Sequence, residues 1–328
     1  MADVKKKILV PNTISLGALE VLKKRDDIDT VVYDVTLPTA QFHALLKDAQ
    51  GIALSMTPFG AAELQAAPQI RVVARIGVGY DAVDVPALTR HNIPLMVTGN
   101  ANSPTVAENA LFLMMALAKL GAHFDRMTKE NRWWDRMKQL PSDLLHKTVL
   151  VVGFGRIGTR ISRFCLALGM TVLVYDPYVR GAVIEGAGYT PVNDLEAALS
   201  RADFVTIHCP KTDETRGMFN AARLARMKPT AYLVNTARGG IIDEKALHAA
   251  LTGGKLAGAG LDVFETEPVP ADNALLNLPN VITAPHMAGV TRESVDRMGV
   301  ATITNILDVL DGKPNLENVV NRGIYEHR

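Results

Sequence analysis

The chain has 328 residues, 48% of them apolar and 21% charged, with 35 basic and 34 acidic side chains and a net charge of +1. This length exceeds one ordinary domain and favours two. The balanced charge gives no reason to expect a nucleic-acid or membrane partner held by bulk charge. Cys165 and Cys209 have no metal-ligand spacing and form no disulfide framework, so we expect no metal site. Because the apolar runs are too short for a signal sequence or a membrane span, we expect a cytoplasmic protein.

The first hundred residues alternate between short β-rich runs and helical patterns. We expect strands at 6–11, 29–35, 51–56, 70–77 and 93–98. Helix-like stretches such as LGALEVLKKR lie between these runs. Alternation of this kind is typical of parallel strands joined by helices.

The pattern changes at 102–120, NSPTVAENALFLMMALAKL, which predicts a long apolar helix. Ser103 is its expected N-cap and Pro104 its first helical residue. We expect this helix to bridge two domains and to contribute to a subunit contact.

A second alternating series follows, with strands expected at 148–153, 170–176, 202–209, 230–236, 256–263 and 280–286. A helix is then expected from about Thr291 to Leu310. The last segment, of roughly 40 residues, is too short to form a core of its own, so we expect it to pack back on the first block. This would make the first domain discontinuous.

The strongest local motif is VLVVGFGRIGTRISRF, in which Gly153, Gly155 and Gly158 form G-x-G-x-x-G between a strand and a helix. The first glycine allows a tight turn, the second a close approach of pyrophosphate to the backbone, and the third close helix–strand packing. The helix N-terminus then offers N–H groups and a positive dipole end to the phosphates. A plain glycine-rich turn is the alternative, but the flanking strand and helix favour a dinucleotide site.

Asp176 follows the next strand, 18 residues after Gly158. A carboxylate at this place accepts a hydrogen bond from the ribose 2′-hydroxyl and repels a 2′-phosphate, so the residue favours NAD. The alternative is that Asp-Pro-Tyr is only a turn. The nearby Arg180 would weaken the discrimination between NAD and NADP.

Three more polar residues follow strands of the second series: Arg238, Asp262 and His286. The carboxyl ends of parallel strands lie on one edge of the sheet, and ligands bind outside that edge. Each residue also has an ordinary structural interpretation, such as an Asx turn for Asp262 or a satisfied rim histidine for His286. Their joint place beside a dinucleotide motif favours a functional role.

These motifs resemble the D-isomer-specific 2-hydroxyacid dehydrogenases over essentially the whole chain. The resemblance is carried by RIGVGYDAVD (75–84), SPTVAENAL (103–111), VGFGRIG (152–158), HCPKTDETRGM (208–218), NTARGGIIDEKAL (235–247), LDVFETEP (261–268) and APHMAG (284–289). It implies an α/β fold of two doubly wound domains. The expected parts are a discontinuous flavodoxin-like substrate domain, 1–101 and 288–328, and a Rossmann NAD-binding domain, 102–287.

The resemblance also implies a catalytic set of Arg238, Glu267 and His286. His286 would give a proton to the carbonyl oxygen of a 2-oxo acid while hydride leaves NADH, and take it back in oxidation. Glu267, hydrogen-bonded to the ring, would favour the imidazolium and fix its orientation. Arg238 would bind the substrate carboxylate and polarise the carbonyl.

The matched motifs further imply two sets of contacts. Asp262 is expected near the nicotinamide end of the cofactor. The other cofactor contacts expected, besides the glycines and Asp176, are Arg156, Ile157, Cys209, Pro210, Thr215, Thr236 and Ala237. The backbone N–H groups of Val78 and Gly79 suit an anion nest for the substrate carboxylate, and Ser55 is expected beside them.

Leu54 narrows the range of expected substrates. It stands where relatives that resemble phosphoglycerate dehydrogenase carry an arginine. An apolar side chain cannot pair with a phosphate, so we expect a small unphosphorylated acid such as hydroxypyruvate or glyoxylate. D-3-phosphoglycerate dehydrogenase stays an alternative. Formate is not expected, because formate dehydrogenases of this family carry glutamine where Glu267 stands.

Other classes of function stay open. A non-enzymatic NAD-sensing protein, similar to the C-terminal-binding corepressors, would keep the same motifs. Another doubly wound NAD enzyme, such as alanine dehydrogenase, fits the ordered motifs poorly. The resemblance implies a homodimer, and Trp133 and Trp134 are expected either to close the pocket or to line a dimer contact.

Overall fold

The computed structural model describes residues 5–326 and separates into two compact units. Unit 1 comprises the chain up to Asn102 together with the segment from Val290 onward, and unit 2 comprises Ser103–Gly289.

Unit 1 is built on a parallel five-stranded sheet in the order β2-β1-β3-β4-β5, the order of a flavodoxin-like fold. The strands are β1 (Lys6–Pro11), β2 (Ile28–Tyr33), β3 (Gly51–Leu54), β4 (Val72–Arg75) and β5 (Leu95–Met96). The helices are α1 (Leu16–Lys23), α2 (Thr39–Leu46), α3 (Ala61–Ala66), α4 (Val85–Arg90) and α12 (Arg292–Leu310), followed by the 3-10 turns η3 (Leu316–Asn318) and η4 (Arg322–Tyr325).

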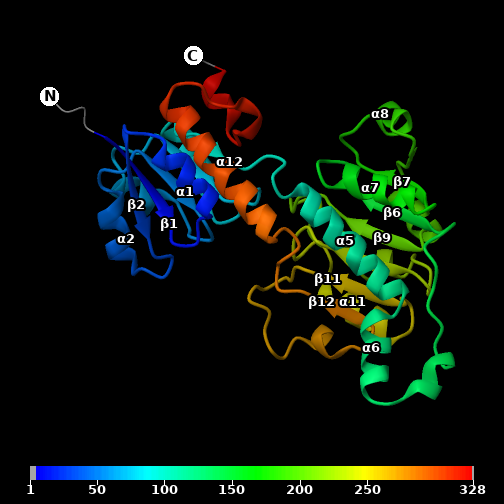
Figure 1. The fold of residues 1–328 in the computed structure, drawn as a ribbon. Coiled ribbons are helices and arrows are strands. Elements are labelled where there is room, and N and C mark those ends of the chain that lie inside the picture. Colours follow the sequence, from blue (N-terminus) through cyan, green and yellow to red (C-terminus); the bar gives the residue numbers. More distant parts are fainter. Residues whose placement is uncertain (1–4, 327–328) are drawn as a thin grey trace. The chain divides into compact units, whose positions relative to one another are not determined.

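The helix α12 returns from the far end of the sequence to cover one face of this sheet (Figure 1). Its Ile303 and Ile306 are fully buried against residues of β1, β3 and β4. It also lies directly against α1, because a Cβ at Gly299 would come within 2.4 Å of the Ser15 hydroxyl oxygen. The helix α12 thus contributes to the core of unit 1.

Unit 2 is built on a parallel seven-stranded sheet in the order β12-β11-β10-β9-β6-β7-β8. The strands are β6 (Thr148–Val152), β7 (Thr171–Tyr175), β8 (Thr190–Pro191), β9 (Phe204–Ile207), β10 (Tyr232–Asn235), β11 (Gly258–Leu261) and β12 (Val281–Thr283). The other elements are α5 (Ser103–Ala118), α6 (Gly121–Lys129), η1 (Trp133–Met137), α7 (Gly158–Ala167), α8 (Gly181–Gly186), α9 (Leu195–Arg201), α10 (Ala221–Leu224), α11 (Glu244–Thr252) and η2 (Ala274–Asn277).

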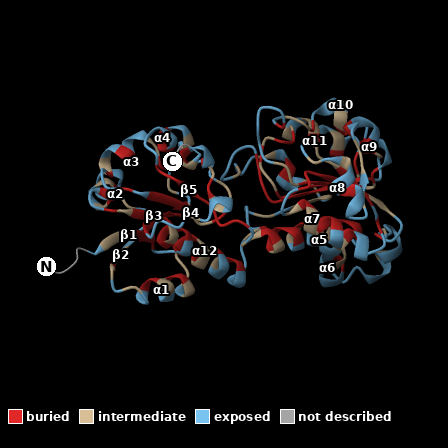
Figure 2. Ribbon diagram, turned by 90° about the horizontal axis from the view of Figure 1, so that it is seen from above, coloured by how far each residue is buried: buried red, intermediate tan, exposed pale blue. Residues whose placement is uncertain are grey.

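The central strands of unit 2 are buried on both faces (Figure 2). Alternate residues of β6 enter two different core clusters, Leu150 and Val152 on one face and Val149 and Val151 on the other. The strand order turns outward in both directions from the β6–β9 pair. This is the switch point at which doubly wound sheets bind ligands outside their carboxyl edge.

The fold-class prediction is confirmed, since both units are parallel doubly wound α/β sheets. The strands are shorter than predicted at most ends, and β5 has only two residues because Val97 and Thr98 donate their N–H groups to Asn318 and Gly77 instead of a strand neighbour. The strand β8, the helix α6 and the 3-10 turn η1 are among the elements that the sequence analysis did not name. Among residues 5–326 no single helix is long and apolar enough to cross a membrane, although α5 and α6, bent by 57°, pass that test when taken as a pair.

Candidate cofactor and catalytic site

The turn between β6 and α7 is shaped by its three glycines. Gly153 has φ +96°, and a Cβ there would come within 2.7 Å of the backbone nitrogen of Cys209. A Cβ at Gly158 would lie 1.9 Å from the Gly153 carbonyl oxygen. Around Gly155, by contrast, a Cβ would meet nothing within 4 Å. Gly153 and Gly158 are therefore needed for folding. Gly155 instead leaves open space beside the start of α7, where a pyrophosphate fits.

Asp176 follows β7 directly, and its carboxylate is held beside this turn. One oxygen accepts a hydrogen bond from the Phe154 N–H at 2.7 Å, and the other accepts from the Tyr178 N–H at 2.9 Å. These bonds fix the carboxylate next to the glycine turn, which is the place that a ribose hydroxyl requires. Arg180 lies at the start of α8, and the Tyr178 hydroxyl is hydrogen-bonded to Glu214.

The loop after β9 contains three predicted cofactor contacts, Cys209, Pro210 and Thr215. The Thr215 hydroxyl donates to the Pro210 carbonyl at 2.7 Å and accepts from the Thr212 N–H at 2.8 Å, so it shapes the loop. Burial raises the pKa of the Cys209 thiol to about 11, and the nearby Asp176 carboxylate adds to this rise. The thiol is therefore neutral and acts as a small apolar wall of the site.

His208 is a candidate site residue that the sequence analysis did not name. Burial lowers the pKa of His208 to about 3, so the ring is neutral. Its Nε2 lies 2.8 Å from the Thr206 hydroxyl, but its buried Nδ1 has no partner among residues 5–326. The buried hydroxyl of Thr236, a predicted cofactor contact, has none either.

The residues that carry these two atoms directly follow two neighbouring strands. Ile207 pairs with Asn235 in the β9–β10 register, so the next residues, His208 and Thr236, follow the two strands at the same edge. Buried polar atoms without partners call for a polar ligand or water. The hydroxyl groups of a bound dinucleotide supply that chemistry.

Arg238 lies in the loop that follows β10, and the loop is held by Asn235. The Asn235 side chain accepts from the Ala237 N–H at 3.0 Å and donates to the Arg238 carbonyl at 2.9 Å. The Arg238 guanidinium donates to the Ala237 carbonyl at 2.7 Å and is half-buried. The side chain is thus kept close to the carboxyl edge of the sheet.

His286 and Glu267 form a direct pair. The His286 Nδ1 lies 2.7 Å from Glu267 Oε2, and Glu267 Oε1 accepts from the Phe264 N–H at 3.0 Å. The two side chains are 43% and 33% exposed, so the ring remains open to a substrate. His286 also has φ +55°, a left-handed conformation that non-glycine residues adopt rarely and often at functional sites.

Asp262 anchors the segment that contains His286. Its carbonyl accepts from the His286 N–H at 2.8 Å, and its carboxylate oxygens accept from the N–H groups of Met287 at 2.7 Å and Ala288 at 2.9 Å. Burial raises the pKa of Asp262, although these two N–H bonds oppose the rise. The sequence predicted a cofactor contact here, whereas the structure shows both oxygens already bonded to the histidine loop.

The predicted substrate contacts Ser55, Val78 and Gly79 belong to unit 1, where they follow β3 and β4. Leu54 is completely buried in the core, so its side chain does not face a ligand. Arg75, however, ends β4 opposite Leu54, and its guanidinium donates to the Leu54 and Ile76 carbonyls and lies 3.2 Å from the Met56 sulfur. A cation therefore lies beside the 54–56 segment after all.

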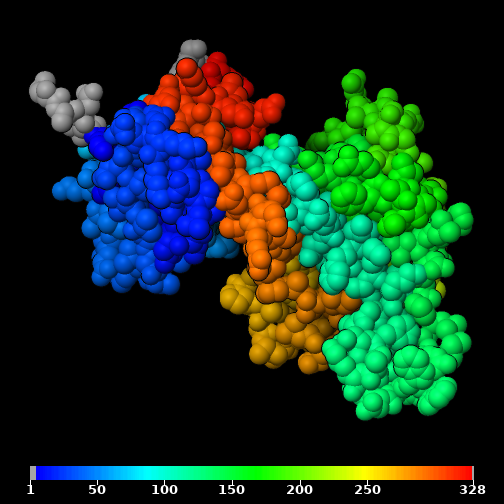
Figure 3. Space-filling model, in the orientation of Figure 1, coloured from blue at the N-terminus to red at the C-terminus, as the bar shows by residue number. Residues whose placement is uncertain are grey.

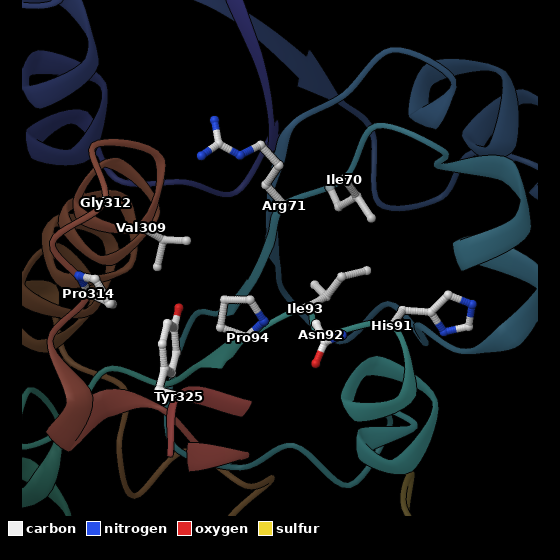
Figure 4. Close-up of a pocket in the computed structure, with 10 residues that line it drawn as sticks. All are labelled: Ile70, Arg71, His91, Asn92, Ile93, Pro94, Val309, Gly312, Pro314 and Tyr325. Atoms are coloured by element: carbon white, nitrogen blue, oxygen red, sulfur yellow. The ribbon is translucent and has the colours of Figure 1, made fainter. Parts of the chain in front are cut away.

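A cavity of about 320 Å³ lies elsewhere in unit 1, at the amino ends of β4 and β5 (Figure 4). Arg71, Pro94, Val309 and Tyr325 are among its lining residues. In the close-up, the Arg71 and His91 side chains extend away from one another. None of the predicted site residues lines this cavity, which lies at the edge of the sheet opposite to Ser55 and Val78.

Comparison with known proteins supplies independent evidence. A family model described as "D-isomer specific 2-hydroxyacid dehydrogenase, NAD binding domain" matches residues 111–288. The glyoxylate reductase of Korarchaeum cryptofilum is 41% identical over 281 residues, which cover 83% of this chain and 84% of that protein. The D-3-phosphoglycerate dehydrogenase of Synechocystis sp. is 38% identical over 309 residues, which cover 94% of this chain but 55% of that protein. This chain thus spans little more than half the length of the latter relative.

Solved structures of similar fold hold either dinucleotide. The NADPH-dependent glyoxylate/hydroxypyruvate reductase of Sinorhizobium meliloti, in complex with NADP and malonate, has a TM-score of 0.83 at 32% identity, covering 97% of this chain and 98% of that one. The NAD-dependent formate dehydrogenase of Staphylococcus aureus, in complex with NAD, has a TM-score of 0.81 at 26% identity, covering 96% and 98%.

Proposed function

Because this chain belongs to the D-isomer-specific 2-hydroxyacid dehydrogenases, we propose that it interconverts a 2-oxo acid and a D-2-hydroxy acid with NAD as the hydride carrier. The observation that supports this activity best is the His286–Glu267 pair, 2.7 Å apart and open to solvent in the NAD-binding unit. A histidine held in this way is the usual proton donor and acceptor at a carbonyl oxygen.

The proposed reaction uses three side chains of unit 2. When bound, the nicotinamide supplies the hydride that goes to C2 of the oxo acid. His286 gives its proton to the carbonyl oxygen through Nε2, because Nδ1 is engaged with Glu267. Glu267, which is bonded to Nδ1, fixes the orientation of the ring. Arg238 binds the carboxylate of the acid with its planar donor fork and polarises the carbonyl.

The matched family model is that of an NAD-binding domain, so the cofactor prediction is confirmed at that level. We propose that the pyrophosphate lies at Gly153, Gly155, Arg156, Ile157 and Gly158, and that the Asp176 carboxylate accepts from the 2′-hydroxyl. The same carboxylate repels a 2′-phosphate and favours NAD over NADP. Thr236 and His208, with their buried unpartnered atoms, would bind hydroxyl groups of the cofactor. Cys209, Pro210 and Ala237 would line the site.

For the acid, we propose a small unphosphorylated 2-oxo acid such as hydroxypyruvate or glyoxylate. The support is the similarity to two glyoxylate-reducing proteins, together with the lack of an arginine at position 54. In unit 1, the N–H groups of Val78 and Gly79, together with Ser55, are proposed to bind the carboxylate of the acid.

A phosphorylated acid is the second candidate, and Arg75 favours it. The absence of an arginine at position 54 argued against a phosphate, but the Arg75 guanidinium reaches the backbone of the same segment. Several D-3-phosphoglycerate dehydrogenases are 36–38% identical to this chain over at least 94% of its length.

The deciding experiment is NADH oxidation with hydroxypyruvate, glyoxylate, pyruvate, phenylpyruvate and 3-phosphohydroxypyruvate, with NADPH run beside it. We expect kcat/KM to be highest for an unphosphorylated acid with NADH. Preference for 3-phosphohydroxypyruvate, lost in Arg75→Leu, would establish the second candidate instead. Tight NADH binding without turnover on any acid would contradict both and favour the NAD-sensing role.

We also propose a homodimer in the cytoplasm. The segment 119–140 forms part of the surface of unit 2 (Figure 3) and exposes Trp133, Trp134, Met137 and Leu140 by 57%, 83%, 70% and 66%. The Arg136 guanidinium lies 5.4 and 5.1 Å from the two indole rings. Apolar side chains gathered in this way are typical of a protein interface. The free thiols of Cys165 and Cys209 fit a reducing compartment.

A further inference from the structure

Two glutamates near the proposed catalytic residues form a reciprocal pair of hydrogen bonds, in which each carboxylate accepts from the backbone N–H of the other residue. The Glu244 N–H donates to the Glu265 carboxylate at 3.0 Å, and the Glu265 N–H donates to the Glu244 carboxylate at 2.5 Å. Glu244 is the first residue of α11, and Glu265 lies in the loop after β11. We name this reciprocal pair of bonds the glutamate brace.

The brace is itself held in place. The second oxygen of Glu244 accepts from the Asn273 side-chain amide at 2.8 Å, and the other end of that amide accepts from the Leu275 N–H at 3.0 Å. The Glu265 carboxylate lies at the N-terminus of the nine-residue helix α11, where the helix dipole favours a negative charge. Both carboxylates thus occupy fixed positions.

The brace joins the loop of Arg238 to the loop of Glu267. Gly239, which follows Arg238, lies so close to the second loop that a Cβ would come within 1.6 Å of the Phe264 carbonyl oxygen. The Phe264 N–H in turn donates to Glu267. The chain from Arg238 to α11 and the chain from Phe264 to Glu267 are therefore held together at Gly239 and at the brace.

Beyond Phe264, the second loop is held by the brace and by the Glu267 carboxylate, which bonds to the Phe264 N–H and to His286. Glu265 and Glu267 are exposed, and neither belongs to a strand or helix. Irregular exposed segments of this kind open at low free energy unless specific bonds hold them. A shift of about 1 Å at a reacting group costs up to roughly a hundredfold in rate.

We propose that Glu244 and Glu265 are positioning residues, whose brace sets the spacing between Arg238 and the Glu267–His286 pair that proton transfer requires. This inference rests on the proposed function, because it concerns the alignment of the proposed acid and base. Neither glutamate touches the substrate, so each acts only through the loops that it holds.

The test compares Glu265→Ala with Glu265→Gln, using hydroxypyruvate and NADH on the full chain. Alanine removes the acceptor for the Glu244 N–H, whereas glutamine keeps one oxygen for it. We expect Glu265→Ala to lower kcat about tenfold and to raise the solvent deuterium isotope effect, because proton transfer from a misplaced His286 becomes slower. Glu265→Gln should regain most of the rate. The NADH dissociation constant should stay unchanged in both variants, and the loss of charge at the N-terminus of α11 should lower the melting temperature by only about 2–4 °C.

Glu196→Ala is the matched control, since it removes an acidic side chain from the first turn of another helix, α9, and leaves the catalytic loops alone. An unchanged kcat and isotope effect in Glu265→Ala would overturn the proposal. Equal losses in the alanine and glutamine variants would also overturn it, because charge rather than the bond would then be responsible. His286→Asn, measured in parallel, separates the failure of the positioning role from the failure of the proposed function. Retained turnover in that variant would contradict the assignment of His286 as the acid and base.

Discussion

Two regions of this molecule contain nearly the same arrangement of side chains. In each, a histidine ring is paired with a glutamate carboxylate, and that carboxylate also accepts a hydrogen bond from the backbone N–H of the residue three positions earlier. In unit 2, Glu267 binds His286 at 2.7 Å and the Phe264 N–H at 3.0 Å. In unit 1, Glu63 binds His43 at 3.1 Å and the Gly60 N–H at 2.8 Å. The contact alone therefore does not identify a catalytic pair.

What differs is the setting of the two pairs. His43 and Glu63 lie on α2 and α3, and their side chains are 27% and 16% exposed. His286 and Glu267 follow strands β12 and β11 at the carboxyl edge of the sheet, where doubly wound folds bind their ligands. His286 also adopts a left-handed backbone held by Asp262. Place in the sheet, rather than the side-chain pair, distinguishes a proposed active site from a helix–helix contact.

The largest expected effect tests this distinction directly. His286→Asn should lower turnover about a thousandfold, because the proton donor is lost, while NADH binding persists. His43→Asn, the matched change in unit 1, should leave turnover unchanged. Steady-state rates and NADH fluorescence titrations measure both effects. Equal loss of turnover in the two variants would remove the basis of the comparison.

The next prediction concerns the cofactor side of the same edge. Gly155→Ala should raise the NADH dissociation constant at least about tenfold, because the added methyl group fills the space proposed for pyrophosphate. The melting temperature should not fall, since a Cβ there meets no protein atom within 4 Å. Gly186→Ala in α8, where a Cβ likewise meets nothing within 4 Å, is the control and should bind NADH normally. Unchanged NADH binding in Gly155→Ala would place the cofactor elsewhere.

Asp176 lies at the same edge of the sheet but has no histidine partner within the described part of the chain, and its proposed role is to select NAD over NADP. Asp176→Asn removes the charge but keeps an acceptor for the Phe154 or Tyr178 N–H. We expect the ratio of kcat/KM for NADPH to that for NADH to rise about fivefold, since the repulsion of a 2′-phosphate is lost. Kinetics with each cofactor at saturating acid measure the ratio. A constant ratio would mean that other residues select the cofactor.

The smallest expected effect belongs to unit 1 and concerns pH. Burial alone would raise the pKa of Glu63, but the bonds from His43 and the Gly60 N–H outweigh it and lower the pKa below 4.5. Because the folded-state pKa is lowered, this carboxylate stabilises the fold above pH 4.5 and ceases to do so as the pH falls through the lowered value. Glu63→Gln should cost about 1 kcal/mol at pH 7 and progressively less in acid. Urea unfolding at several pH values tests this, and a pH-independent difference would contradict it.

Much of the candidate site could be proposed from the sequence because its residues follow strands in order. A glycine turn, Asp176, Arg238 and His286 each come just after an apolar run, and a parallel sheet brings such positions to one edge. The parallel strands follow from the alternation of β-rich and helical stretches, whereas the return of the C-terminal segment was expected because that segment is too short to form a core of its own. The predicted strands extend beyond the observed ones, because β-forming residues such as Val97 continue past the last hydrogen bond between neighbouring strands.

What could not be predicted depends on contacts between distant segments. Among residues 5–326 the buried Nδ1 of His208 has no partner, a property of its three-dimensional surroundings that no local pattern shows. Asp262 bonds to Met287 and Ala288, residues that no local pattern links to it. Arg75 reaches the segment after Leu54 only because β4 pairs with β3 in that register.

The return of α12 has a consequence for synthesis. Unit 2 is one continuous stretch of chain, whereas unit 1 is divided by it. While the ribosome makes residues 103–289, the face of the first sheet that includes Ile8, Val10 and Val72 lacks Ile303 and Ile306, its covering residues. The second unit can therefore complete its core before the first, although it is made later. The nascent protein would expose this apolar face for as long as translation of the middle segment lasts.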